Sequence, residues 1–301
     1  MNTSQLATLT TITAEIALAL HPILIKQVGV SLPTQLFARL GTYSALGAAL
    51  GSTEDRKFSW GSWSAATQSL VYGLMNLVHI GSSYLSYEHL PAGSALAIFY
   101  TYPFFNILAG VLFLGDKFDA SLIPLLGMAF LGVVLISKYT KEGKEDEQET
   151  KQKEGFEKKP TKSIIIGVVA SLISALTETL IFMIAKTGQE PSAFLPILKL
   201  YPGAFLGLLA FLGATKSPLS TDVNKWIPLL LFNIFIGFLG YGLRFWSIPR
   251  LPTAVFSILT FIGVAAGYGW GLTYAKEVPS GGALLGAGLI TGALGILRVK
   301  A

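Results

Sequence analysis

The sequence predicts an all-α membrane protein with ten transmembrane helices, arranged as two inverted five-helix repeats. Three observations lead to this fold class. Hydrophobic residues make up 52% of the chain and charged residues only 13%, whereas about a quarter of a soluble domain is charged. The charges leave long runs that are free of Asp, Glu, Lys and Arg. Unusual features of the first half also recur in the second half.

The charge-free runs are long enough, or nearly so, to cross roughly 30 Å of hydrocarbon as helices. They cover 58–87, 90–115, 226–243, 251–275 and 278–297. A membrane β-barrel is disfavoured, because its strands alternate apolar and polar residues and no such alternation occurs. Apolar runs and their flanking charges, Pro and Gly predict helices over 8–27, 33–51, 63–85, 92–114, 119–138, 163–186, 193–214, 225–246, 253–275 and 280–298.

The only long polar stretch, residues 139–162, contains seven Lys, seven acidic residues and one Phe. It cannot bury a core, so we expect a charged linker. Five predicted helices precede it and five follow it. The predicted domains are therefore a first repeat over 1–138 and a second over 163–301. An odd number of helices in each repeat inverts one relative to the other across the membrane.

Sliding one half onto the other aligns several uncommon features. With an offset of 160 to 163 residues, the aligned pairs are Leu90-Pro91 with Leu251-Pro252, Asp116 with Glu277, Arg39 with Lys199, and Glu15 with Glu178. A basic residue thus lies inside the second predicted helix of both halves, which supports an internal repeat.

Several kinds of function are disfavoured by composition. The chain has no cysteine and only three histidines, which fall on separate segments, so we expect no metal site and no cofactor. No nucleophile with a base, carboxylate pair or phosphate-binding loop stands out, so an enzyme is not expected. The net charge of +5 is scattered over helix ends, as beside lipid headgroups, and does not indicate nucleic-acid binding.

One segment carries a family resemblance. It runs from His89 through Leu90-Pro91-Ala92 and Tyr102-Pro103 to Phe113-Leu114-Gly115-Asp116, and Leu251-Pro252 through Glu277 repeats its pattern. In these features the chain resembles the EamA-like type of the drug/metabolite transporter superfamily. The resemblance implies a ten-helix bundle whose central cavity is lined by the third, fourth, eighth and ninth helices. It implies transport of a metabolite and leaves the solute open.

Charged residues inside predicted helices are candidate functional residues, because a charge near the bilayer centre costs several kcal/mol and normally faces a cavity or a partner. They are Glu15, Arg39, Glu178, Lys199 and Arg244. Helix rise places Glu178 and Lys199 at about the same depth, roughly 9 to 12 Å from one membrane face, so they are expected to be within reach of each other. These residues are either proton carriers and anion anchors or neutralising pairs that fix helix register.

Pro103 is predicted to bend the fourth helix and to expose backbone carbonyls to a solute. Phe99, Tyr102 and Asn106 share a helix face with this bend, which favours an aromatic and polar strip over a packing kink. Asn76 and His79 share a face of the third helix, where His79 is either a titrating group or a hydrogen-bonded packing residue. Tyr241 and Arg244 supply similar chemistry on the eighth helix.

These features predict a secondary active transporter of a small polar solute, anionic or zwitterionic, such as an amino acid, that works by alternating access. Coupling to protons and exchange of solutes both stay open. The alternatives are a sugar-phosphate or nucleotide-sugar exchanger, whose ninth-helix Lys and Arg signatures are absent, a channel, and a non-transporting scaffold or receptor. The expected location is the plasma membrane or an organelle membrane, with both termini cytoplasmic, although counting the linker lysines reverses the orientation.

Overall fold

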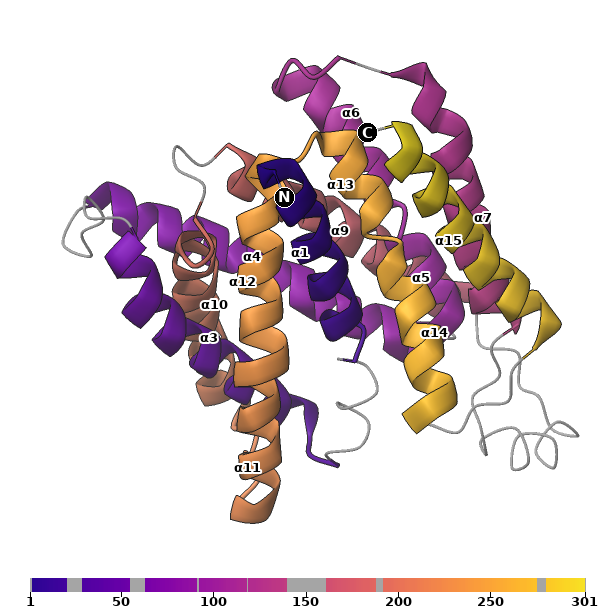
Figure 1. Cartoon of the computed structure of the whole chain (residues 1–301). Coiled ribbons are helices and arrows are strands. Elements are labelled where there is room, and N and C mark those ends of the chain that lie inside the picture. Colours follow the sequence, from indigo (N-terminus) through magenta and orange to yellow (C-terminus); the bar gives the residue numbers. More distant parts are fainter. Residues whose placement is uncertain are drawn as a thin grey trace, which may run out of the picture. The chain divides into compact units, whose positions relative to one another are not determined.

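A computed structural model describes residues 2–20, 29–54, 63–90, 92–117, 119–139, 161–187, 192–274 and 280–300 (Figure 1). Over these residues all regular structure is helical, with no strand. The predicted all-α class is confirmed. Most of the predicted linker, 140–160, lies outside the described residues.

Helices of the first half follow the predicted segments, except that the first helix ends at Leu18, short of the predicted end at residue 27, and residues 21–28 lie outside the described residues. The helices are α1 (Thr3–Leu18), α3 (Leu32–Glu54), α4 (Trp63–His89), α5 (Ala92–Phe99), α6 (Tyr102–Phe113) and, after the short turn η1 (Ala120–Leu122), α7 (Ile123–Tyr139). The first helix begins five residues earlier than predicted, because Asn2 and Gln5 form a capping box. The Asn2 side chain accepts from the Gln5 N–H at 2.8 Å, and the Gln5 side chain accepts from the Asn2 N–H at 3.1 Å.

Helices of the second half are also close to prediction, but two of the predicted segments are divided. The elements are α9 (Thr161–Lys186), α10 (Leu195–Thr215), α11 (Val223–Phe232), the π-helix η3 (Asn233–Phe238), α12 (Leu239–Ser247), η4 (Ile248–Arg250), α13 (Thr253–Leu259), α14 (Ile262–Tyr274) and α15 (Gly281–Lys300).

Six helical stretches among the described residues are long and apolar enough to cross a membrane. They are Ala95–Phe113, Ala120–Tyr139, Lys162–Lys186, Leu195–Thr215, Val223–Arg250 and Thr253–Tyr274. Large apolar side chains such as Phe113, Leu206 and Phe235 are exposed on these stretches. An exposed apolar surface of this extent suits contact with lipid.

The first compact unit comprises 1–80 and 180–252. In this unit α3 packs along α10, and α1 packs along α12. Glycines permit the close approach: a Cβ on Gly51 would lie 2.8 Å from the Phe194 carbonyl, and one on Gly240 would lie 2.9 Å from Leu18 Cδ2. Small residues at helix contacts allow membrane helices to pack closely, and Gly51 is one of them.

The second compact unit comprises 81–179 and 253–301. Here α7 and α15 lie side by side (Figure 1), and α6 packs against α13. At the first of these contacts Gly132 and Gly286 face each other, and a Cβ on either glycine would lie 2.5 to 2.6 Å from the other's carbonyl oxygen. Each compact unit therefore draws helices from both sides of the charged linker. The division into repeats at 1–138 and 163–301 stays a prediction.

Candidate functional site

A helix break lies where Pro103 predicts a bend. α5 ends at Phe99 and α6 begins at Tyr102, with Pro103 in its first turn, a place where the missing proline N–H costs nothing. The N–H groups of Phe104 and the next residue donate to the Thr101 carbonyl, at 3.0 and 3.4 Å. α6 therefore starts a hydrogen-bond ladder of its own.

A second break separates α13 from α14 at Thr260 and Phe261, although residues 253–274 contain no proline. Across it, Phe261, Gly263 and Val264 donate their N–H groups to carbonyls three residues earlier, at 3.1 to 3.2 Å. This is the tighter 3₁₀ pattern, which marks hinges and functional positions inside helices. Phe261 follows Tyr100 by 161 residues, the same offset that aligns Leu90 with Leu251.

The two breaks contact each other through aromatic rings in the second compact unit. The ring centroids of Tyr100 and Phe261 are 5.9 Å apart. Phe99 and Tyr102 lie 5.1 Å apart, and Tyr100 and Tyr102 lie 5.6 Å apart. Tyr102 and Phe261 are almost fully buried. We call Phe99, Tyr100, Tyr102 and Phe261 the aromatic cluster.

Next to this cluster, α6 and α13 carry buried polar side chains. The Thr253 hydroxyl donates to the Asp116 carboxylate, and a Cβ on Gly110 would lie 3.1 Å from Thr253 Cγ2. Because the two helices are antiparallel, one turn inward from this contact Asn106 and Ser257 lie at about the same level. Both have 0% exposure, and neither the Asn106 amide nor the Ser257 hydroxyl has a hydrogen-bond partner among the described residues.

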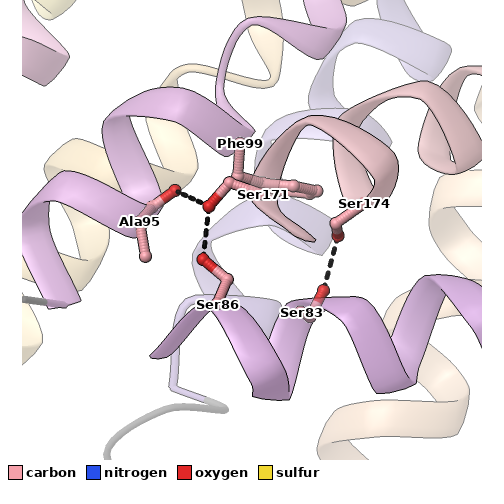
Figure 2. Close-up of a pocket in the computed structure, with 6 residues that line it drawn as sticks. All are labelled: Ser83, Ser86, Ala95, Phe99, Ser171 and Ser174. Atoms are coloured by element: carbon pink, nitrogen blue, oxygen red, sulfur yellow. Dashed lines mark hydrogen bonds between the residues drawn. The ribbon is translucent and has the colours of Figure 1, made fainter. Parts of the chain in front are cut away.

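A cavity of about 50 Å³ lies beside the aromatic cluster, and Figure 2 shows its lining. Its walls are Ser83 and Ser86 of α4, Ala95 and Phe99 of α5, and Ser171 and Ser174 of α9. The hydroxyls of Ser83 and Ser174 are 2.6 Å apart, Ser86 is hydrogen-bonded to Ser171, and Ser171 donates to the Ala95 carbonyl at 3.4 Å. We call this cavity the serine pocket.

Glu178 lies on the same face of α9, one turn beyond Ser174, and is 3% exposed. The neighbouring Thr179 hydroxyl donates to the Tyr102 carbonyl at 3.4 Å. This bond ties α9 to the start of α6. The second compact unit therefore combines a hydroxyl-lined cavity, an aromatic cluster and a buried carboxyl group.

The first compact unit contains a buried ion pair. Arg244 Nε of α12 lies 3.2 Å from Glu15 Oε1 of α1, and both side chains are more than nine-tenths buried. Two buried charges of opposite sign lower each other's cost of leaving water. Glu15, interpreted from the sequence as a possible neutralising group, therefore has Arg244 as its partner.

Arg39 lies among tyrosines in the same unit. Its guanidinium carbon is 5.7 Å from the ring centroid of Tyr43 and 5.5 Å from that of Tyr241, distances suited to cation–π attraction. Arg39 also donates to the Tyr241 hydroxyl at 3.0 Å, and the rings of Tyr43 and Tyr201 are 4.8 Å apart. This cluster keeps a partly exposed cation in a fixed orientation.

Asn76 and His79 are both buried on α4, as their shared helix face predicts. The Asn76 amide donates to the Leu200 carbonyl of α10 at 3.4 Å. Lys199, the residue before Leu200, is half-buried. α4 and α10 thus share a polar contact inside the first compact unit.

Comparison with known proteins identifies this arrangement. Residues 5–138 match the model of the EamA-like transporter family, which is part of the drug/metabolite transporter superfamily. Over these residues the chain is similar to the EamA-like transporter family. A protein of known crystal structure has the same fold, with a TM-score of 0.70, 14% sequence identity, and 98% of each chain covered. No curated protein matches the sequence.

The predicted site residues fall into two groups. The second compact unit holds Phe99, Tyr102, Pro103, Asn106 and Glu178. The first compact unit holds Glu15, Arg39, Asn76, His79, Lys199, Tyr241 and Arg244. Glu178 and Lys199 belong to different units, so their predicted contact stays a prediction.

The serine pocket, Ser257 and the π-helix were not predicted from the sequence. The pairs Ser83 with Ser86 and Ser171 with Ser174 each have a spacing of three residues, which places both hydroxyls on one helix face. This spacing could have indicated the serine pocket from the sequence alone. The π-helix at Asn233–Phe238 is a type of insertion common at functional sites, and no proline within it indicates a change of helix type.

Proposed function

We propose that this protein is a secondary transporter that moves a small polar solute across a membrane by alternating access. The observation that carries the proposal is the paired break in α5–α6 and α13–α14. Interrupted helices at corresponding positions of two halves are typical of transporter binding sites, and non-helical backbone at membrane depth is tolerated where it is buried in protein or lines a water-filled cavity.

We further infer ten transmembrane helices in two inverted repeats. If a two-fold axis relates the halves, a helix can pack on the helix at the same position in the other half. Otherwise, when helix A of one half packs on helix B of the other, helix B of the first half must pack on helix A of the second. α3 packs on α10, α6 on α13 and α7 on α15, which are counterparts by position in each half. The contacts of α1 with α12 and of α4 with α9 are the exchanged pair. This pattern supports the repeat.

The proposed solute is anionic or zwitterionic, such as an amino acid. Arg39 and Lys199 are the cations that favour it, since Arg244 is within 3.2 Å of Glu15. The aromatic cluster and Asn106 are proposed to contact the uncharged part of the solute. Glu178 and His79 are the candidates for proton coupling. A plasma or organelle membrane with cytoplasmic termini remains the proposed location.

The transport proposal is tested with the purified chain in liposomes. Vesicles preloaded with an unlabelled amino acid mixture are expected to take up a labelled amino acid faster than empty vesicles, because a carrier returns faster when loaded. Saturation of this counterflow argues against a channel. Sugar phosphates and nucleotide sugars are measured in parallel arms, and counterflow of those alone would replace the proposed solute class. Absence of counterflow for every class, with and without a pH gradient, contradicts the transporter proposal and favours a scaffold or receptor.

Substitution of Asn106 by Leu is expected to reduce transport at least 10-fold without lowering the melting temperature. A buried amide without a hydrogen-bond partner costs folding free energy, of order 1 to 3 kcal/mol, so an isosteric apolar side chain is neutral or stabilising. A side chain that lowers stability is expected to persist in a protein when function needs it, and we propose that the Asn106 amide persists because it binds solute. Initial uptake rates and thermal melting in detergent measure the two effects.

The matched control for Asn106→Leu is Ser137→Ala on α7. The Ser137 hydroxyl is also buried without a partner among the described residues, but it lies outside the proposed site. This variant is expected to keep both stability and transport. If Asn106→Leu transports normally, Asn106 does not bind solute. If it melts well below the wild type, the amide is a packing element instead.

A further inference from the structure

The serine pocket offers oxygen atoms from three helices to one small space. Four hydroxyls and the Ala95 carbonyl face it, and Phe99 covers one side (Figure 2). The two Ser–Ser hydrogen bonds each use one lone pair of the accepting oxygen. A hydroxyl oxygen carries two lone pairs, so acceptor capacity remains for a ligand at Ser83, Ser86 and Ser171.

The size of the serine pocket limits what it accepts. Its volume is about 50 Å³, which is several times the roughly 10 to 15 Å³ that one water molecule needs. The pocket therefore suits a small ion with one or two waters and excludes a metabolite. Among the described residues no group of three or more His, Asp or Glu side chains is positioned for a metal ion. Transition metals and Ca²⁺, which need such ligands, are disfavoured.

Comparison of two helix pairs indicates the charge of the ion. In the α1–α12 pair, Glu15 faces Arg244. In the α9–α4 pair the repeat offsets of 163 and 161 residues place Glu178 at the position of Glu15, and Ser83 at the position of Arg244. At the position where the α1–α12 pair has the Arg244 guanidinium, the α9–α4 pair has the Ser83 hydroxyl and the serine pocket. A cation in the pocket would take the place of the guanidinium. This comparison rests on the proposed inverted repeat, whereas the oxygen ligands do not.

We propose that the serine pocket binds a sodium ion. The hydroxyls of Ser83, Ser86, Ser171 and Ser174 and the carbonyl of Ala95 supply neutral oxygen ligands. The Glu178 carboxyl group lies one helical turn away, and its oxygens favour a cation over an anion. Bound there, the ion ties α4, α5 and α9 together next to the helix break.

The proposal is tested on the full-length protein in detergent, without solute and without a gradient. Replacing choline chloride with NaCl at constant ionic strength is expected to raise the melting temperature by about 2 to 4 °C, because a ligand of the folded state stabilises it. KCl is expected to give a smaller shift. Direct binding of radioactive ²²Na⁺ to immobilised protein measures the affinity.

The double variant Ser83→Ala with Ser174→Ala is expected to weaken ²²Na⁺ binding at least 10-fold. Glu178→Gln is expected to weaken it as well. The matched control is Ser163→Ala, since Ser163 lies on α9, is hydrogen-bonded to His89 at 2.8 Å and does not line the pocket. Each variant is melted in choline chloride to establish that it is folded.

Two results overturn the sodium site: wild-type protein that gives the same melting curve in NaCl and choline chloride, or a serine double variant that binds ²²Na⁺ as the wild type does. Transport is measured separately in sodium-free liposomes. A protein that binds Na⁺ but moves no solute contradicts only the proposed function. A protein that moves solute but binds no Na⁺ contradicts only the sodium site.

Discussion

Replacing Gly203 with alanine is expected to cause the largest loss of stability of any single methyl addition at the glycines that the structure describes. A Cβ on Gly203 would lie 2.1 Å from the Ser69 carbonyl oxygen and 3.1 Å from the Leu70 Cα, and a Cβ on the facing Gly73 would lie 2.4 Å from the α10 backbone. The obstacles are backbone atoms of a helix, which cannot turn aside as a side chain can. α4 and α10 must separate, and overpacking of this kind costs about 1 to 3 kcal/mol or more.

Gly213→Ala is the control for this substitution. It lies on the same helix, and a Cβ there would meet nothing within 4 Å. Because alanine favours helix over glycine by roughly 1 kcal/mol, this variant should melt at or slightly above the wild-type temperature. Fluorescence-detected melting in detergent compares the two variants. Equal melting curves for Gly203→Ala and Gly213→Ala would show that the close α4–α10 contact is wrong.

Breaking the Glu15–Arg244 pair from one side is expected to be the second large effect. Glu15→Gln leaves the buried Arg244 without its carboxylate, and removal of one partner of a buried pair costs about 3 to 5 kcal/mol. The double variant Glu15→Leu with Arg244→Met removes both charges and fills similar volume. It is expected to be more stable than Glu15→Gln, since apolar replacement of a whole buried pair is often neutral.

The same variants decide between the two interpretations of Glu15. Melting temperatures give the coupling between the residues, and counterflow of the double variant shows whether the pair takes part in transport. A stable double variant that transports normally makes the pair structural. A stable double variant without transport makes it part of the mechanism. Glu15→Gln with wild-type stability would contradict the ion pair itself.

Much of the fold was predictable because membrane-spanning helices are recognisable in a sequence as long apolar runs. The break at Tyr100 was also predictable, since Pro103 cannot continue a helix. The equivalent break at Thr260 was not, because no residue in 253–274 forbids an ordinary helix there. It is set by 3₁₀ hydrogen bonds and by the packing of Phe261 on Tyr100.

The sequence identified candidate site residues more readily than it identified which of them contact each other. Charge inside an apolar run identified Glu15 and Arg244 from sequence, and both are buried. Depth along a helix is readable from sequence, but which helices are neighbours is not. The partner of Glu15 therefore had to come from the packing of α1 on α12. Serines at the α4–α9 contact were overlooked because serine is also common where it does nothing specific.

The make-up of the two compact units constrains how the chain is assembled during synthesis. α3 ends at Glu54, but its partner α10 is complete only at Thr215. At typical ribosome speeds of 5 to 20 residues per second, α3 spends roughly 10 to 30 seconds in the bilayer before that surface emerges. Lipid, or another membrane protein, must cover the glycine face of α3 in the meantime. Neither half of the polypeptide carries a finished core, so the nascent chain becomes a stable body only after segments of both halves have been synthesised.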